Sequence, residues 1–119
     1  MAQLFVIPGR LPGYNDLAKG HWATQKKVKI RGMKIVDAYA RQAKIQPVKG
    51  RVSIRISCYE PNARRDFDNV LSGASKVILD ALQNMGVLKG DGQKYVEYRP
   101  VPVMIDRKNP HVEVQIEEA

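Results

Sequence analysis

The stretch from Val70 to Met85 has the clearest periodic pattern in the chain. Its apolar residues recur three and four positions apart, at Val70, Leu71, Ala74, Val77, Ile78, Ala81, Leu82 and Met85. This spacing places them on one side of an α-helix. Because such a stripe must be buried against another layer of structure, the pattern predicts a helix that packs on a sheet.

Two aspartates precede this helix. In an extended segment, residues two apart point to the same side, so Asp66 and Asp68 would project together while Phe67 turns into the core. Asp68 and Asn69 are also good caps for the helix that follows, because their side chains accept hydrogen bonds from its first turn. A functional pair and a structural cap are both consistent with the sequence.

A third aspartate follows the helix. Gly86 predicts the helix end, and the glycines on either side of Asp91 predict a tight turn that presents its carboxylate. An isolated Asp-Gly is also typical of an ordinary turn. Several basic residues lie near the three acids: Arg64, Arg65, Lys76, Lys89 and Lys94. Carboxylates without histidine or cysteine suit Mg²⁺, so the stretch indicates a place where Mg²⁺ and a polyanion meet.

The rest of the chain predicts strands and a second helix. The expected strands span residues 4–7, 52–59, 95–98, 103–105 and 111–117. A loop rich in proline and glycine follows the first strand at 8–16, and Pro100 and Pro102 interrupt the later strand material. We therefore expect one domain over residues 1–119 of the α+β class. Its mixed sheet would have two helices packed against it, in the order β-α-β-α-β-β.

Another helix, which precedes the Val70–Met85 stretch in the chain, is expected from about Trp22 to Ile45. It is strongly basic, with Lys26, Lys27, Lys29, Arg31, Lys34, Arg41 and Lys44 against a single acid, Asp37. A charge run is often a solvated face, but this excess also suits a surface that faces DNA. The two interpretations are about equally supported by the sequence.

The composition is that of a small, basic globular domain. The 119 residues include 20 Lys and Arg against 12 Asp and Glu, for a net charge of +8, and 44% are hydrophobic. This hydrophobic content argues against disorder. The positive excess is the footprint of a protein that binds phosphate backbones, although a merely soluble basic protein would share it.

Other classes of site find no support in the sequence. The single cysteine, Cys58, lies in an alternating apolar run and is expected to be buried. His21 and His111 lack partners at the spacing of zinc ligands. No run is long enough for a signal peptide or a membrane span, so we expect a cytoplasmic, nucleoid-associated protein with no membrane partner and no small-molecule cofactor.

Four pieces of sequence between Pro61 and Val96 occur in an order that is typical of one family. They are Arg-Arg-Asp-Phe-Asp-Asn at 64–69, Lys-Val-Ile-Leu-Asp-Ala-Leu at 76–82, Gly-Val-Leu at 86–88 and Asp-Gly-Gln at 91–93. Together they resemble the RusA family of Holliday-junction resolvases. The proline-rich loop followed by Asn15 is also similar to the family, and would lie near the active site or the DNA.

The resemblance implies a homodimeric endonuclease that depends on Mg²⁺, with Mn²⁺ as a substitute. It would nick four-way and other branched DNA symmetrically, in recombination and repair. The catalytic acids, which also bind one or two metal ions, would be Asp66, Asp68 and Asp91. We expect DNA contacts from Lys26, Lys27, Arg31, Lys34, Arg64, Arg65 and Lys89. Apolar segments at 103–105 and 112–116 are expected at the dimer contact.

The catalytic lysine of the family has two candidate positions here. Counting back from Asp80 places it at Lys76, whereas counting forward from Asp68 places it at Ser72, since the segment between is about one helical turn longer than in the family. Lys76 lies about 12 Å further along the helix than Asp68. We assign Lys76 as the catalytic lysine and keep Ser72 as the alternative.

Two other functions fit parts of the sequence. In a non-catalytic DNA-binding module the aspartates would be caps and turns, and binding would be independent of Mg²⁺. In a Mg²⁺-dependent enzyme for a small phosphate compound, a glycine-rich phosphate loop would be expected, and the sequence has none. The broad basic helix also favours a large anion.

Overall fold

The computed structural model describes residues 2–118, which form three helices and five strands. In chain order these are β1 (Ala2–Pro8), α1 (Tyr14–Ala18), α2 (Trp22–Gln42), β2 (Val52–Glu60), α3 (Phe67–Asn84), β3 (Val96–Arg99), β4 (Met104–Ile105) and β5 (His111–Glu118). The expected α+β class with a mixed sheet is confirmed. The short helix α1 was not predicted and lies where a loop was expected.

The sheet combines an antiparallel half and a parallel half. Its order is β1-β5-β2-β3, with β5 antiparallel to both β1 and β2. Strands β3 and β4 both run parallel to β2, along the same side of it. Pro100 and Pro102 lie between these two short strands, where the missing N–H groups interrupt the ladder as predicted.

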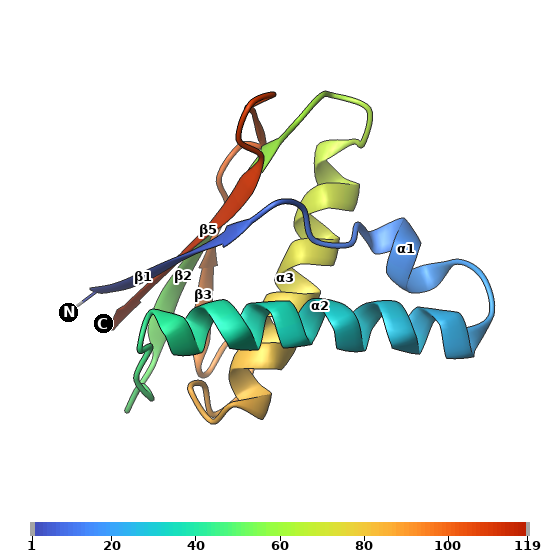
Figure 1. Ribbon diagram of the computed structural model, residues 1–119. Helices are drawn as coiled ribbons and strands as arrows, with labels where there is room; N and C mark the ends of the chain where they lie inside the picture. The colour runs from blue at the N-terminus through green and yellow to red at the C-terminus, as the bar shows by residue number, and fades with distance from the viewer. Residues whose placement is uncertain (1, 119) are drawn as a thin grey trace.

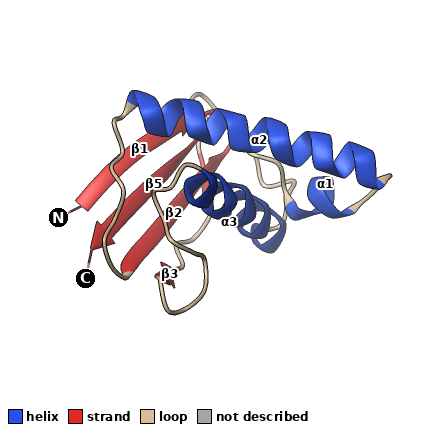
Figure 2. Ribbon diagram, turned by 90° about the horizontal axis from the view of Figure 1, so that it is seen from below, coloured by secondary structure: helices blue, strands red, loops and turns tan. Residues whose placement is uncertain are grey.

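Both long helices pack on one face of the sheet, and α2 and α3 cross each other there (Figures 1 and 2). The inward side chains of the strands alternate with outward ones, and Ile7, Ile54 and Val114 are fully buried beneath the helices. Within residues 2–118 no helix covers the opposite face of the sheet, and Leu4 and Val6 are exposed there.

The loop between β1 and α1 is clamped into the angle between the two long helices. A Cβ on Gly73 of α3 would lie 2.2 Å from the carbonyl oxygen of Pro12 and 2.6 Å from the Cα of Gly13. A Cβ on Gly32 of α2 would lie 3.0 Å from Val77. The absence of side chains at Gly73 and Gly32 therefore permits the close approach that holds α1 beside α2 and α3 (Figure 1).

Several predicted details differ in the structure. Helix α2 ends at Gln42 rather than near residue 45, and Lys44 just beyond it has a left-handed φ of 59°. Strand β5 lies between two strands and its apolar side chains are buried in the core, so it has no free apolar edge for the dimer contact expected at 112–116. As expected, Cys58 is buried, and burial raises the pKa of its thiol to about 12. No helix within residues 2–118 is long and apolar enough to cross a membrane.

Candidate functional site

The acidic segment before α3 does not have the conformation that the sequence suggested. Asp66 is the residue before the first helical turn, Asp68 lies within that turn, and Phe67 between them is 68% exposed. The expected burial of Phe67 is therefore wrong, because the helix begins two residues earlier than predicted and removes the strand-like alternation. A carboxylate in the first turn, such as that of Asp68, is favoured by the helix dipole.

The predicted capping roles are also not observed. Asp68 and Asn69 lie inside the helix, and the side chain of Asp66 makes no capping hydrogen bond. Asn69 Oδ1 instead accepts a hydrogen bond of 2.8 Å from the backbone N–H of Asn15. This contact brings the proline-rich loop and α1 against the beginning of α3, which carries Asp66 and Asp68.

A buried carboxylate fixes the segment that leads into α3. Glu60, at the end of β2, is 2% exposed and accepts hydrogen bonds from Arg10 and Arg65. Arg65 Nη1 also donates to the carbonyl oxygen of Leu11 at 3.1 Å. Burial acts to raise the pKa of Glu60, but the hydrogen bonds from Arg65 and Arg10 outweigh it and the pKa lies below its ordinary value.

Arg64 and Arg65, which were both predicted to bind DNA, therefore have different surroundings. The side chain of Arg65 is 19% exposed and faces Glu60, so a DNA contact would compete with its structural role. Arg64 is exposed and its guanidinium has no carboxylate partner within residues 2–118. The cluster of Arg10, Glu60 and Arg65 was not identified from the sequence, because its members come from separate parts of the chain.

A hollow of about 470 Å³ opens where α1, α2, α3 and the loop after α3 meet. Its polar lining consists of Tyr14, Lys29, Ser72, Ser75, Lys76, Asp80 and Asp91. Both candidate positions for the catalytic lysine, Lys76 and Ser72, therefore face the same space. Asp91 is brought there from the opposite end of α3, as the loop after the helix folds back.

The three predicted acids stand in different relations to this hollow. Asp91 lines it, whereas Asp68 is not part of the lining but has Oδ1 3.5 Å from the hydroxyl oxygen of the lining residue Ser72. Asp66 is exposed at the beginning of α3 and is not part of the lining. The hollow thus contains one of the three acids, and a second, Asp68, is linked to it through Ser72.

None of the three aspartates forms an ion pair with another described residue, whereas Asp16, Asp37 and Asp80 all do. No set of three His, Cys, Asp or Glu side chains in residues 2–118 is close enough together to hold a metal ion. Mg²⁺, however, keeps several waters and often binds through one or two carboxylates. The oxygen-only donor set of Asp68, Asp91 and Ser72 therefore fits Mg²⁺ chemically.

Two lysines in the hollow share one carboxylate. Lys29 Nζ lies 2.6 Å from Asp80 Oδ2, and Lys76 Nζ lies 3.5 Å from the same atom. The pairing of Lys76 with Asp80 follows the i,i+4 spacing on one helix and was visible in the sequence. Lys29 comes from α2 and was not among the predicted site residues, because its position depends on how the two helices cross.

The predicted DNA-binding residues of α2 lie on its outer side. Lys27, Arg31 and Lys34 are three and four residues apart and exposed, so they share one face of the helix. Lys26 and Lys89 are also exposed, the latter in the loop after α3. None of these five side chains forms an ion pair with a described carboxylate. They leave a positive surface beside the hollow.

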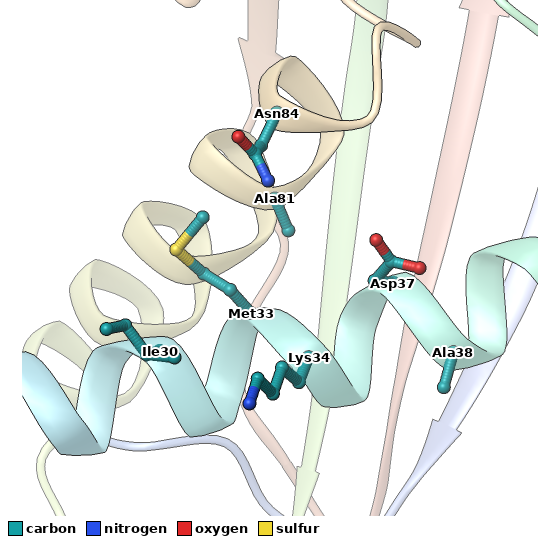
Figure 3. A pocket seen from close by; sticks show the side chains of 7 residues that line it. All are labelled: Ile30, Met33, Lys34, Asp37, Ala38, Ala81 and Asn84. Carbon is teal, nitrogen blue, oxygen red and sulfur yellow. The ribbon is translucent and has the colours of Figure 1, made fainter.

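A second hollow of about 340 Å³ lies between α2 and α3 (Figure 3). Ile30, Met33 and Ala81 contribute to its walls, and the side chain of Met33 points from α2 toward α3. None of the three predicted aspartates lines it. Lys34, Asp37 and Asn84 also line it, and Asp37 is paired with Arg41, so the hollow that contains the predicted residues Ser72, Lys76 and Asp91 is the better candidate site.

Comparison with known proteins yields no match, either to a protein family or to a curated protein.

Proposed function

We propose that this protein is a Mg²⁺-dependent endodeoxyribonuclease that resolves four-way DNA junctions by paired nicks. The observation that carries the proposal is the hollow whose lining brings Asp91 together with Lys29 and Lys76, and to which Asp68 is linked through Ser72. It brings unpaired carboxylates and cations together in a chain of net charge +8. The resemblance of residues 64–93 to the RusA family supports the same activity.

Asp68 and Asp91 would hold the metal ion, with Asp66 close by in sequence at the exposed beginning of α3. When bound, Mg²⁺ supplies a Lewis acid for phosphodiester hydrolysis. Ser72 restrains Asp68 through their contact of 3.5 Å, and Lys76 supplies positive charge next to the reacting phosphate. Arg65, held by Glu60, keeps the beginning of α3 in place.

The outer surface of α2 would hold the arms of the substrate. Lys26, Lys27, Arg31 and Lys34 are exposed and unpaired among the described residues, and contacts of this kind to phosphates position a protein on DNA without reading its sequence. Arg64 and Lys89 would add contacts near the acids. A protein of this activity would act at the nucleoid, in recombination and repair.

The experiment is incubation with a labelled synthetic four-way junction, with Mg²⁺ and with EDTA, resolved on a denaturing gel. We expect nicks at matching positions on two opposed strands with Mg²⁺, and none with EDTA. Linear duplex of the same arm sequence is the control and should remain intact. Binding without any product at any Mg²⁺ or Mn²⁺ concentration would support the non-catalytic DNA-binding module instead.

Paired nicking also requires two active sites, and we propose a homodimer for this reason. Two chains related by a closed two-fold axis present two hollows in matching orientation. The contact lies outside β5, which has no free edge. Light scattering should give about twice the mass of one 13.4 kDa chain, and a single-chain mass both free and with junction DNA would contradict the dimer.

A further inference from the structure

Lys29 and Lys76 differ from the other lysines that the structure describes, because each of them forms an ion pair with a carboxylate. Lys29 from α2 and Lys76 from α3 meet on one oxygen, Oδ2 of Asp80, at 2.6 and 3.5 Å. The Asp80 side chain is 17% exposed, whereas those of Lys29 and Lys76 are 36% and 56% exposed. The carboxylate is therefore the inner member, and both lysine side chains remain partly accessible from solvent.

The charges and donors of this trio are not balanced. Two ammonium groups face one carboxylate, so the trio itself carries one net positive charge, while Asp91 on the same lining brings the charge of the hollow as a whole to zero. Each ammonium group has three N–H donors, and one contact with Asp80 leaves the others free for a ligand. A group with several acceptor oxygens and a negative charge would satisfy both lysines at once.

We propose that Lys29 and Lys76, held together by Asp80, form a binding position for a single phosphodiester group of a DNA strand. This inference rests on the proposed function, which supplies DNA as the polyanion. It adds Lys29 as a substrate-binding residue and Asp80 as the residue that positions both lysines. The position lies in the same hollow as Asp91, so a phosphate held there is carried next to the proposed metal-binding acids.

The pairing distinguishes this position from the outer face of α2. There, each lysine is free to contact a different phosphate, so losses should add from one lysine to the next. In the hollow, two lysines serve one phosphate. Removing both should therefore remove one phosphate contact rather than two.

The experiment measures binding of a fluorescent four-way junction by anisotropy in EDTA, over a series of salt concentrations. The variants are Lys29→Gln, Lys76→Gln and the double variant, with Lys49→Gln as a control that removes an exposed lysine outside the hollow. Each phosphate contact contributes about 0.9 to the slope of log affinity against log salt. We expect the double variant to lose about one unit of slope, each single variant to lose no more than the double, and the control to match the wild type.

Three outcomes would overturn the inference. They are an unchanged slope in Lys29→Gln and the double variant, a loss of about two units in the double variant, and an equal loss in the Lys49→Gln control. Circular dichroism verifies that each variant is folded, and Lys29→Arg, which keeps the charge, should keep the slope.

A parallel cleavage assay separates this inference from the proposed nuclease activity. Junction cleavage by the wild type together with an unchanged Lys29→Gln slope would reject the lysine pair alone. If the salt-dependence slopes are as expected but the wild type cuts no junction in Mg²⁺, the proposed nuclease activity is rejected. The phosphate-binding role of Lys29 and Lys76 would then still be supported.

Discussion

Arg65 donates hydrogen bonds from Nε and Nη2 to the two carboxylate oxygens of Glu60, at 2.9 and 2.8 Å. Two parallel bonds of this kind fix the mutual orientation of the side chains. Glu60 ends β2 and Arg65 directly precedes Asp66, so the pair sets where the acidic beginning of α3 lies relative to the sheet. Arg10 completes the cluster from the loop after β1.

Removal of Glu60 should destabilise the protein markedly. Glu60→Ala leaves Arg65, whose side chain is 19% exposed, with only the longer 3.8 Å contact to Asp16, and breaking a buried ion pair typically costs about 3 kcal/mol or more of unfolding free energy. Urea denaturation measures this change. Glu117→Ala, which removes an exposed acid from β5, is the control and should change stability by less than about 0.5 kcal/mol. Equal stability of the two variants would show that the Glu60 cluster contributes little.

The same cluster predicts a pH dependence. The pKa of Glu60 in the folded protein lies below its ordinary value of 4.5, so folding favours the ionised form. The resulting stability is fully present above pH 4.5 and is lost as the pH falls through the lower folded-state pKa. The stability difference between wild type and Glu60→Gln, which cannot titrate at this position, should therefore be constant above pH 4.5 and shrink below it. Urea denaturation at a series of pH values tests this, and a difference that grows below pH 4.5 would contradict the assigned cause.

The fold was largely predictable because its long elements carry strong patterns. The apolar stripe from Val70 to Met85 located α3 to within a few residues, and the alternation after Val52 located β2. Helix α1 was missed because five residues between Gly13 and Lys19 have no periodic signal of their own. Its position depends on tertiary contacts, such as the hydrogen bond between Asn15 and Asn69 and the close approach to Gly73.

The predicted residues that line the hollow, Ser72, Lys76 and Asp91, all come from the stretch that carries the family resemblance. Lys76 and Asp80 are four residues apart, so their contact could be anticipated. Lys29 reaches Asp80 from another helix, and no local pattern distinguishes it from its basic neighbours. Phe67 was placed in the core because strand alternation was assumed for a segment that is in fact helical.

Replacing Asp68 should separate cleavage from binding. Asp68→Asn removes a carboxylate charge that the proposed metal ion requires, but leaves the basic surface intact, so junction cleavage should fall below detection while affinity is unchanged or tighter. Because Asp68 is exposed, its replacement should change the free energy of unfolding by less than about 0.5 kcal/mol. Asp106→Asn, in a turn between β4 and β5, is the matched control and should cut normally. Full cleavage by folded Asp68→Asn protein would exclude the assigned role.

The outer face of α2 can be tested through its charges. Simultaneous replacement of Lys26, Lys27 and Lys34 by Gln should weaken junction binding and reduce its salt dependence, because each lost phosphate contact releases about one fewer counterion. Titrations of the labelled junction at several salt concentrations give the slope. A triple variant of Lys49, Arg107 and Lys108 removes the same charge from exposed positions outside α2 and should bind nearly as the wild type does. If both triple variants lose the same slope, the effect reflects net charge and not a DNA-facing helix.

Gly73 links the packing of the fold to the shape of the hollow. In Gly73→Ala the new Cβ would lie 2.2 Å from the carbonyl oxygen of Pro12, and backbone cannot move aside as a flexible side chain would. Overpacking of this kind typically costs about 1–3 kcal/mol, partly offset by the roughly 1 kcal/mol that alanine gains over glycine within a helix. The loop that precedes α1 must shift, and with it Tyr14, which lines the hollow. We therefore expect lower stability in urea together with weaker junction binding at low salt. Gly50→Ala, where nothing lies within 4 Å of the new Cβ, should leave both unchanged, and a Gly73→Ala protein indistinguishable from it would show that the loop yields without disturbing the site.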